Sequence, residues 1–252
     1  MPILRAILNG LRDFGFDPLK TLKALKGSGR FLGQAIQFRL KSKNSNFKIS
    51  LALTDYSDSA GSARGHYFWQ DLICAQWIYD SRSSNHFDCG SRIDGFIAHL
   101  IPFTKVVQVD IRPMTVEIPN LEIVIGNAQE NLSVFAGKYQ SVSSLHSIEH
   151  FGLGRYGDPI DPNGHVKGLK NISECVSAGG TLYVSFPIGK ASVEFNAQRV
   201  IDPMWPIEQL PGFKLEDFVL IPWVDAPVYG MHPSEVDKSV WGQAGLYKFS
   251  RV

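Results

Sequence analysis

Two histidines and a glutamate lie close together in the segment His146-Ser-Ile-Glu-His150. Because an imidazole titrates near neutral pH, His150 is a candidate general base, with Glu149 holding its ring. Alternatively, His146, Glu149 and His150 could ligate a divalent transition metal such as zinc, iron, nickel or manganese. A hydrogen-bonded His–Glu pair with a structural role is the third alternative. His-x-x-Glu-His also occurs in inverted zinc proteases, but there it lies within a helix, whereas here it follows an expected strand.

A glycine turn and an acidic residue some twenty positions further on form a second chemical pattern. In the turn Asp88-Cys-Gly-Ser-Arg-Ile-Asp-Gly95, Gly90 lets the backbone approach a ligand, and Asp88 can orient the loop or receive a cationic group. Asp110 ends the next expected strand, where a carboxylate accepts hydrogen bonds from ribose hydroxyls. Asn127 follows the third strand and could bond an adenine edge. This order predicts a nucleotide-like ligand held by Asp88, Gly90, Ser91, Arg92, Asp110, Asn127 and Ala128.

Two loops are expected to bind a substrate. In the loop 154–162, Arg155 could clamp a phosphate or carboxylate and Asp158 could bind sugar hydroxyls, although the Asp-Pro pairs could serve only to build turns. The segment between the last two expected strands is rich in proline and aromatic residues, Trp241 among them. This composition predicts a loop that closes over the substrate site as a lid. We therefore expect a substrate site that includes Arg155, Tyr156, Asp158, Trp223 and Tyr229.

Short apolar strands alternate with helical stretches from residue 66 onward. We expect helices at 67–80, 93–101, 131–136 and 166–176, the last ending at Ala178-Gly-Gly180, and strands at 86–89, 105–110, 121–125, 140–145, 181–186, 214–221 and 246–250. Strands separated by helices imply right-handed crossovers and a doubly wound, mostly parallel α/β sheet. No helical pattern separates the last two strands, so they should form an antiparallel hairpin. The polar turns described above would then meet at one edge of the sheet.

Four segments of the chain resemble class I S-adenosylmethionine-dependent methyltransferases. Within that superfamily they resemble a little-characterised subgroup, a domain of unknown function, whose members are commonly encoded with bacterial surface-polysaccharide genes. The segments are Gly65-His-Tyr-Phe-Trp-Gln-Asp-Leu72, Asp88-Cys-Gly-Ser-Arg-Ile-Asp-Gly95, Val109-Asp-Ile-Arg-Pro113 and Ser147-Ile-Glu-His-Phe-Gly-Leu-Gly-Arg-Tyr-Gly-Asp158. The resemblance covers residues 66–252 and implies a Rossmann-like, seven-stranded sheet that ends in an antiparallel hairpin. One departure is that Arg92 and Asp94 take the second and third glycine positions of the superfamily pattern Asp-x-Gly-x-Gly-x-Gly.

The resemblance implies methyl transfer from S-adenosylmethionine to a hydroxyl of a sugar, nucleotide-sugar or surface glycan. Such a displacement needs aligned reactants, exclusion of water, and one base or metal to handle the proton. The altered glycine turn leaves open metal- or base-assisted lyase, cyclase or epimerase chemistry on the same fold, and a non-catalytic scaffold in polysaccharide assembly is the third alternative. His66, Tyr67 and Gln70 in the first helix of this region would roof the cofactor, or pack as ordinary helix residues.

The composition of the 252 residues is that of a folded protein, with 44% hydrophobic and 19% charged residues. A net charge of +1 argues against a nucleic-acid binder, and no apolar run approaches the ~18 residues of a spanning helix. Three cysteines without a close pair and the lack of a secretory signal pattern favour a cytoplasmic protein.

The first part of the chain differs in charge from the rest. Residues 1–48 hold ten Lys or Arg and two Asp, a net charge of +8, and their leucines recur at helical spacing, which predicts short basic amphipathic helices broken by Gly and Pro. We expect a basic helical arm and linker over residues 1–65, and a methyltransferase-like domain over 66–252. The arm could lie on the inner face of an anionic membrane, contact a glycosyltransferase, or pack on its own domain or on a second copy in a homo-oligomer.

Overall fold

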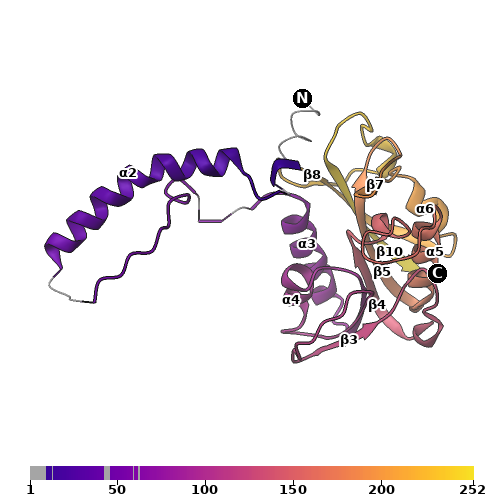
Figure 1. Ribbon diagram of the computed structural model, residues 1–252. Helices are drawn as coiled ribbons and strands as arrows, with labels where there is room; N and C mark the ends of the chain where they lie inside the picture. The colour runs from indigo at the N-terminus through magenta and orange to yellow at the C-terminus, as the bar shows by residue number, and fades with distance from the viewer. Residues whose placement is uncertain (1–9, 13, 43–45, 59, 62) are drawn as a thin grey trace. The chain divides into compact units, whose positions relative to one another are not determined.

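The chain divides into two units, Met1–Ser62 and Ala63–Val252 (Figure 1). The computed structural model describes every residue except 1–9, 13, 43–45, 59 and 62. None of the helices in this described part of the chain is both long enough and apolar enough to cross a membrane.

The first unit contains one long helix, α2, over Pro18–Lys41. Asp17 caps its N-terminus by accepting hydrogen bonds from the backbone N–H groups of Leu19 and Lys20. The prediction of short helices broken by glycine is wrong here, because α2 runs without interruption through its three glycines. Gly27 is buried where the returning chain crosses the helix, and a side chain there would overlap the carbonyl of Leu53. The helix expected around Leu4 and Ile7 lies outside the described residues.

The second unit is built on an eight-stranded sheet with the order β3-β2-β1-β4-β5-β10-β8-β9. Its strands are β1 Asn85–Cys89, β2 Lys105–Asp110, β3 Leu121–Ile125, β4 Tyr139–Leu145, β5 Val176–Ile188, β8 Phe213–Pro222, β9 Val228–Tyr229 and β10 Gln243–Arg251. Neighbours among β1 to β5 pair in parallel, and β10 pairs antiparallel with both β5 and β8. The mostly parallel sheet with antiparallel final strands is therefore confirmed. The expected strand number was one too low, because the two-residue β9 adds to the edge along β8.

Helices cover both faces of this sheet (Figure 1). On one face lie α3 His66–Asp80 and α4 Ala98–Leu100, and on the other lie α5 Gly164–Glu174 and α6 Trp205–Gln209. Adjacent residues of β5 supply the two cores. Tyr183 packs with the α3 side chains Cys74 and Ile78, whereas Val184 packs with Leu169 of α5. This alternation follows from the two-residue period of a strand, and it buries both faces of β5.

Several predicted boundaries are wrong for local reasons. The helix expected to end at Ala178-Gly-Gly180 ends at Glu174, and the glycines belong to β5, where the register against β4 shifts and Gly179 has a φ of +69°. The helix expected at 93–101 begins as a π-helical turn over Ile93–Ile97, and the one expected at 131–136 is a 3₁₀ turn over Ser133–Phe135. The sequence pattern did not reveal α6 or the hairpin of β6 Ser192–Glu194 and β7 Gln198–Val200.

Candidate active site

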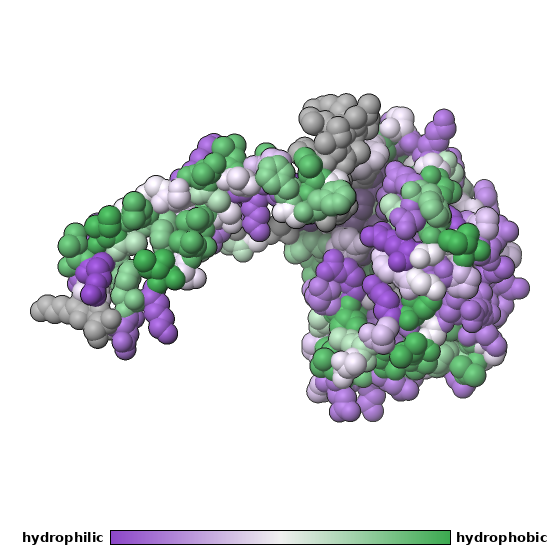
Figure 2. Space-filling model, in the orientation of Figure 1, coloured by the Kyte–Doolittle hydropathy of each residue, from purple (hydrophilic) through white to green (hydrophobic). Residues whose placement is uncertain are grey.

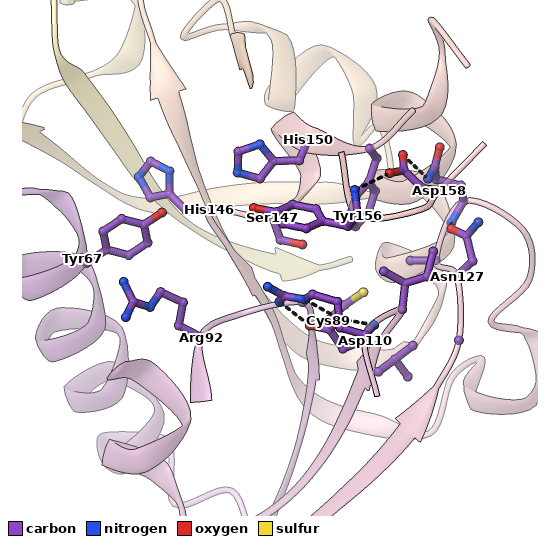
Figure 3. A pocket seen from close by; sticks show the side chains of 18 residues that line it. Tyr67, Cys89, Arg92, Asp110, Asn127, His146, Ser147, His150, Tyr156 and Asp158 are labelled. Atoms are coloured by element: carbon purple, nitrogen blue, oxygen red, sulfur yellow. Dashed lines mark hydrogen bonds and ion pairs between the residues drawn. The ribbon is translucent and has the colours of Figure 1, made fainter. Parts of the chain in front are cut away.

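A cavity of about 250 Å³ lies where the turns after β1, β2, β3 and β4 meet (Figure 3). It is lined by residues that the sequence pattern singled out, namely Gly90, Arg92, Asp110, Asn127, Ala128, His146, His150, Tyr156 and Asp158, and by Tyr67 of α3. These residues come from distant parts of the chain, and the sheet edge brings them together as expected for parallel strands.

The glycine turn after β1 shapes one wall of this cavity. Gly90 has a φ of +73°, and a side chain there would overlap the hydroxyl of Ser147. Asp88 is fully buried beneath the turn, where it accepts hydrogen bonds from the backbone N–H and the hydroxyl of Ser91, at 3.0 and 2.5 Å. Burial raises the pKa of Asp88 to about 6. Asp88 and Ser91 therefore hold the turn from below, while Gly90 and Arg92 line the cavity.

Asp110 lines the cavity at the end of β2, but its carboxylate already has a partner. It accepts hydrogen bonds from the backbone N, Nε and Nη2 of Arg112, at 2.8, 2.9 and 2.6 Å. The guanidinium of Arg112 lies 4.9 Å from the ring centre of Tyr156, on the opposite side of the cavity. Since a carboxylate has about four acceptor positions, a ribose at Asp110 would use the remaining one or displace part of Arg112.

The turn after β3 is held by its own side chains. Asn127 accepts a hydrogen bond from the backbone N–H of Gln129 at 3.0 Å and donates one to Glu130 at 3.2 Å. The carbonyl of Ala128 accepts a hydrogen bond from Asn171 of α5 at 2.8 Å. Asn127 and Ala128 thus line the cavity as a fixed wall, and the Asn127 amide is engaged within its turn.

His146 and Glu149 form a buried pair at the end of β4. The Nδ1 atom of His146 lies 2.7 Å from Oε1 of Glu149, whose side chain is fully buried. A carboxylate only accepts hydrogen bonds, so a ring hydrogen is on Nδ1, and in the neutral imidazole Nε2 carries the lone pair. That Nε2 is buried without a hydrogen-bond partner among the described residues. The geometry is therefore that of a histidine base oriented by a carboxylate.

His150, expected to be the residue that Glu149 orients, has a different partner. Its Nε2 is 3.8 Å from Oε1 of Glu149, beyond hydrogen-bond reach, and its Nδ1 donates to the carbonyl of Ala197 at 2.8 Å. Burial lowers the pKa of His150. Its ring meets Tyr156 edge-on, with 5.6 Å between the ring centres. Glu149 thus holds the ring of His146, not that of His150.

The three residues do not fit a metal site. Among the residues that the structure describes, no three His, Cys, Asp or Glu side chains are grouped so that they could hold a metal ion. One oxygen of Glu149 and the Nδ1 of His150 have hydrogen-bond partners, whereas Oε2 of Glu149 and Nε2 of His146 are buried without one among the described residues, and these two atoms alone do not make a three-ligand site.

A second cavity of about 410 Å³ adjoins the first. Tyr67 and His146 line both cavities. The rings of His66 and His146 stack with 5.3 Å between their centres, and Trp223 meets His66 edge-on at 5.1 Å. Burial lowers the pKa of His66 to about 4, so this ring is neutral at physiological pH. Trp241 lies beyond Trp223, with 6.5 Å between the ring centres. An aromatic wall therefore leads to the ring of His146.

The predicted substrate residues do not all line the same cavity. Trp223 lines the second cavity and Tyr156 the first, whereas Tyr229 is exposed on β9 and lines neither. Arg155 donates to the carbonyl of Ala197 at 3.0 Å and does not line either cavity. Asp158 lines the first cavity, but it accepts a hydrogen bond from the backbone N–H of Gly152 at 2.6 Å and so holds its own loop.

The expected roof over the cofactor is only partly present. Gln70 lines neither cavity, because its side chain is buried in bonds to Ser185 and Asp71. His66 lines the second cavity alone, and Tyr67 lines both.

Sequence reasoning missed Arg199 of β7, which is buried and donates to four backbone carbonyls. They belong to Glu149, Phe151, Asp161 and Pro162, at 3.3, 2.5, 3.4 and 3.3 Å. It also missed Lys190 and Lys238, which line the second cavity. No spacing or motif marks these residues, because Lys190 and Lys238 lie in loops and Arg199 lies in a three-residue strand that is too short to show a period.

Comparisons with known proteins bear on the fold. A family model described as "Caenorhabditis protein of unknown function, DUF268" matches residues 107–215, and no curated protein matches the chain. The solved N-methyltransferase NodS from Bradyrhizobium japonicum WM9 is similar, with a TM-score of 0.50 and 11% identity over 73% of this chain and 94% of that one. NodS in complex with S-adenosyl-L-homocysteine matches with a TM-score of 0.50 and 10% identity over 86% and 97% of the two chains.

The sheet order and these similarities define the fold as that of the class I S-adenosylmethionine-dependent methyltransferases. The predicted fold class is thereby confirmed, with eight strands in place of seven. At identities of 10 and 11% the similarity establishes the fold alone, so the chemistry has to be argued from this chain's own residues.

Proposed function

We propose that the protein transfers a methyl group from S-adenosylmethionine to a hydroxyl of a sugar, nucleotide-sugar or surface glycan. One observation carries this proposal: His146 lines both cavities, with Nδ1 held by Glu149 and Nε2 unpartnered among the described residues. A base in that position can accept the proton of a hydroxyl bound in the second cavity as the hydroxyl oxygen attacks a methyl group presented from the first.

The first cavity suits S-adenosylmethionine because its turns leave the backbone accessible. Gly90 and Arg92 would hold the amino-acid part, Asp110 the ribose, and the turn at Asn127 and Ala128 the adenine. When bound, the cofactor supplies an electrophilic methyl group on a positively charged sulfur. Methyl transfer would leave the sulfur with the electron pair of the broken sulfur–carbon bond, and His146 would take the proton that the acceptor hydroxyl loses.

The second cavity supports a sugar acceptor. Trp223 and Trp241 offer aromatic rings of the kind on which the apolar faces of sugar rings stack, and Lys190 and Lys238 suit a carboxylate or phosphate on the same molecule. Lys238 is held in place by Asp202, with 2.6 Å between Nζ and Oδ2. The resemblance to a subgroup encoded with surface-polysaccharide genes favours the same class of acceptor.

The test is an assay of labelled methyl transfer from S-adenosylmethionine to a panel of sugars, nucleotide-sugars and oligosaccharides. We expect transfer to at least one of them by the wild-type protein, and its loss in Trp223→Ala without loss of S-adenosylhomocysteine binding. Tyr229→Ala is the matched control, because Tyr229 is an exposed aromatic residue outside both cavities. A wild-type protein that binds no S-adenosylhomocysteine at millimolar concentration would contradict methyl transfer. Binding without transfer to any sugar would contradict the acceptor class.

A further inference from the structure

Helix α2 has one face that packs within its own unit. Phe31, Ala35 and Phe38 line a hollow together with residues of the returning segment, which runs back along the helix. The rings of Phe38 and Phe47 stack with 5.8 Å between their centres, and the guanidinium of Arg30 lies 4.7 Å from the ring centre of Tyr56. The returning segment therefore covers this face of the helix.

A different face of the helix is apolar and exposed. The apolar stripe consists of Leu22, Leu25, Leu32, Ile36 and Leu40, whose side chains are 50, 68, 61, 53 and 82% exposed. Their spacing of three, seven, four and four residues places them along one side of the helix. Figure 2 shows hydrophobic surface exposed along α2. Five large aliphatic side chains along one side of a helix differ from the single exposed apolar residues that are common on soluble proteins.

The charges beside the apolar stripe are all of one sign. Helix α2 contains six Lys or Arg and no Asp or Glu. At 100° per residue, Lys26 and Arg30 follow one border of the stripe, and Arg39 lies at the other. Of the acidic residues described near the helix, Asp17 pairs with Arg12, Asp58 pairs with Lys23, and Asp55 lines the hollow on the packed face. The borders of the stripe therefore present positive charge.

We propose that the apolar stripe of α2 binds to the surface of an anionic lipid bilayer, with the helix parallel to the membrane plane. Leucine and isoleucine side chains would enter the boundary between headgroups and acyl chains, while the long basic side chains reach back to the lipid phosphates. Charge complementarity favours an anionic bilayer as the partner of the stripe, because such a bilayer has a flat apolar layer beneath a layer of negative charge. At 1.5 Å per residue the 24-residue helix is about 36 Å long, enough for all five stripe residues to enter together.

Vesicle co-sedimentation of the full-length protein tests this proposal. Vesicles of phosphatidylcholine mixed with phosphatidylglycerol should pellet the protein at low salt, and vesicles of phosphatidylcholine alone should bind it at least about tenfold more weakly. Raising the salt concentration should weaken binding to the mixed vesicles, because exposed charges are then screened. The stripe variant Leu25→Gln/Leu32→Gln/Ile36→Gln should bind them about tenfold more weakly or worse.

Leu51→Gln is the matched control, because Leu51 is 69% exposed in the same unit but lies on the returning segment. It should bind like the wild type, and circular dichroism should show equal helix content in all three proteins. Failure to pellet with mixed vesicles, equal binding to neutral vesicles, or unchanged binding of the stripe variant would each overturn the proposal. So would a wild-type dimer that the stripe variant converts to monomer without any vesicle binding, since the stripe would then join two copies of the chain.

Discussion

His146 has an unusual backbone conformation, with a φ of +46° at the end of β4. For a residue with a side chain such a conformation costs roughly 1–3 kcal/mol, and strain of this kind is concentrated at functional sites. The hydrogen bond to Glu149 offsets part of this cost. The conformation also aims the ring at the boundary of the two cavities, where Figure 3 shows it beside Tyr67.

His146→Gln should lower methyl-transfer turnover by roughly 10²–10⁴-fold, because glutamine cannot take the proton of the acceptor hydroxyl. Affinity for S-adenosylhomocysteine should stay within about twofold of the wild type, since the effect is on the proton and not on binding. Glu149→Gln should also lower turnover, because an amide can donate to Nδ1 and favour the wrong tautomer. Single-turnover kinetics and calorimetry measure both quantities.

The control for this prediction is His150→Gln, at the position expected from sequence to be the base. It should lose much less activity than His146→Gln, because His150 is held by a backbone carbonyl and not by Glu149. A His150 variant that is as inactive as the His146 variant would indicate that His150 is the general base.

Asp110→Ala should weaken binding of S-adenosylhomocysteine by about 1.5–3 kcal/mol, the range for hydrogen bonds to charged groups. Arg112 already donates three hydrogen bonds to this carboxylate, so we expect the lower end of the range. Titration calorimetry measures the loss. Asp80→Ala is the matched control: its exposed carboxylate at the C-terminal end of α3 accepts a hydrogen bond from Gln76 and does not line the cavity. Equal affinities of wild type and Asp110→Ala would show that the ribose is held elsewhere.

At the scale of the elements, a single strand outside the main sheet fixes the loop after β4. Arg199 of β7 is buried and donates to four carbonyls of that loop, and the carboxylates of Asp158 and Asp161 act on its charge electrostatically. Burial lowers its pKa. Because one of those carbonyls belongs to Glu149, the position of β7 determines where the His146–Glu149 pair stands. Arg199 is thus a positioning residue for the site.

Arg199→Lys should lower the free energy of unfolding by about 1–3 kcal/mol, because an ammonium cannot reproduce the planar fork and leaves buried carbonyls unpaired. Urea unfolding measures this loss. Arg155→Lys is the matched control, since Arg155 lies in the loop after β4, is exposed, and donates a hydrogen bond to Ala197 besides its contact with the ring of Tyr156. If the two variants unfold at the same urea concentration, the bonds of Arg199 contribute little.

The sequence predicted the sheet strands better than the connections between them. The predictions for β1, β2 and β3 lie within one residue of the observed bounds. Most residues of β1 and β2 are buried, whereas the edge strand β3 is only partly buried but is still a short, mostly apolar run. The register shift in β5 was not predictable, because it depends on how its first residues pair with Tyr139. The continuity of α2 through its glycines was missed because the returning segment, and not helix propensity, stabilises it.

At the scale of the whole molecule, topology made much of the site predictable. The carboxyl ends of parallel strands meet at one edge, so Gly90, Asp110 and His146 were expected together and do line one cavity. The partner of Glu149 was assigned wrongly. His146 precedes the 3₁₀ turn Ile148–His150 and has a φ of +46°, so helical spacing does not relate it to Glu149. No sequence pattern marks this backbone conformation, which brings His146 to Glu149.

The stability of the second unit should depend on pH through its buried histidines. Burial lowers the pKa values of His66 and His165 to about 4 and that of His86 to about 3, below the ~6.5 of a histidine in the unfolded chain. As the pH falls below about 6.5, these histidines become protonated in the unfolded chain but stay neutral in the folded one, so the free energy of unfolding decreases. Asp71 and Asp88, whose pKa values burial raises to about 6, act in the opposite direction between about 6 and 4.

His86 offers the clearest test, because its two partners are neutral hydroxyls. The hydroxyl of Ser143 donates to Asp88 at 2.6 Å, so it accepts from Nε2 of His86 at 2.7 Å, and Ser141 donates to Nδ1 at 2.7 Å. Glutamine can bond both serines without titrating.

We expect the unfolding free energy of His86→Gln to fall less steeply than that of the wild type between pH 6 and 4, by about 1.4 kcal/mol per pH unit. Above pH 7 the two curves should run parallel, since histidine is unprotonated in both states. Urea unfolding across this range measures both slopes, and parallel curves at pH 4–6 would mean that His86 takes up its proton without unfolding.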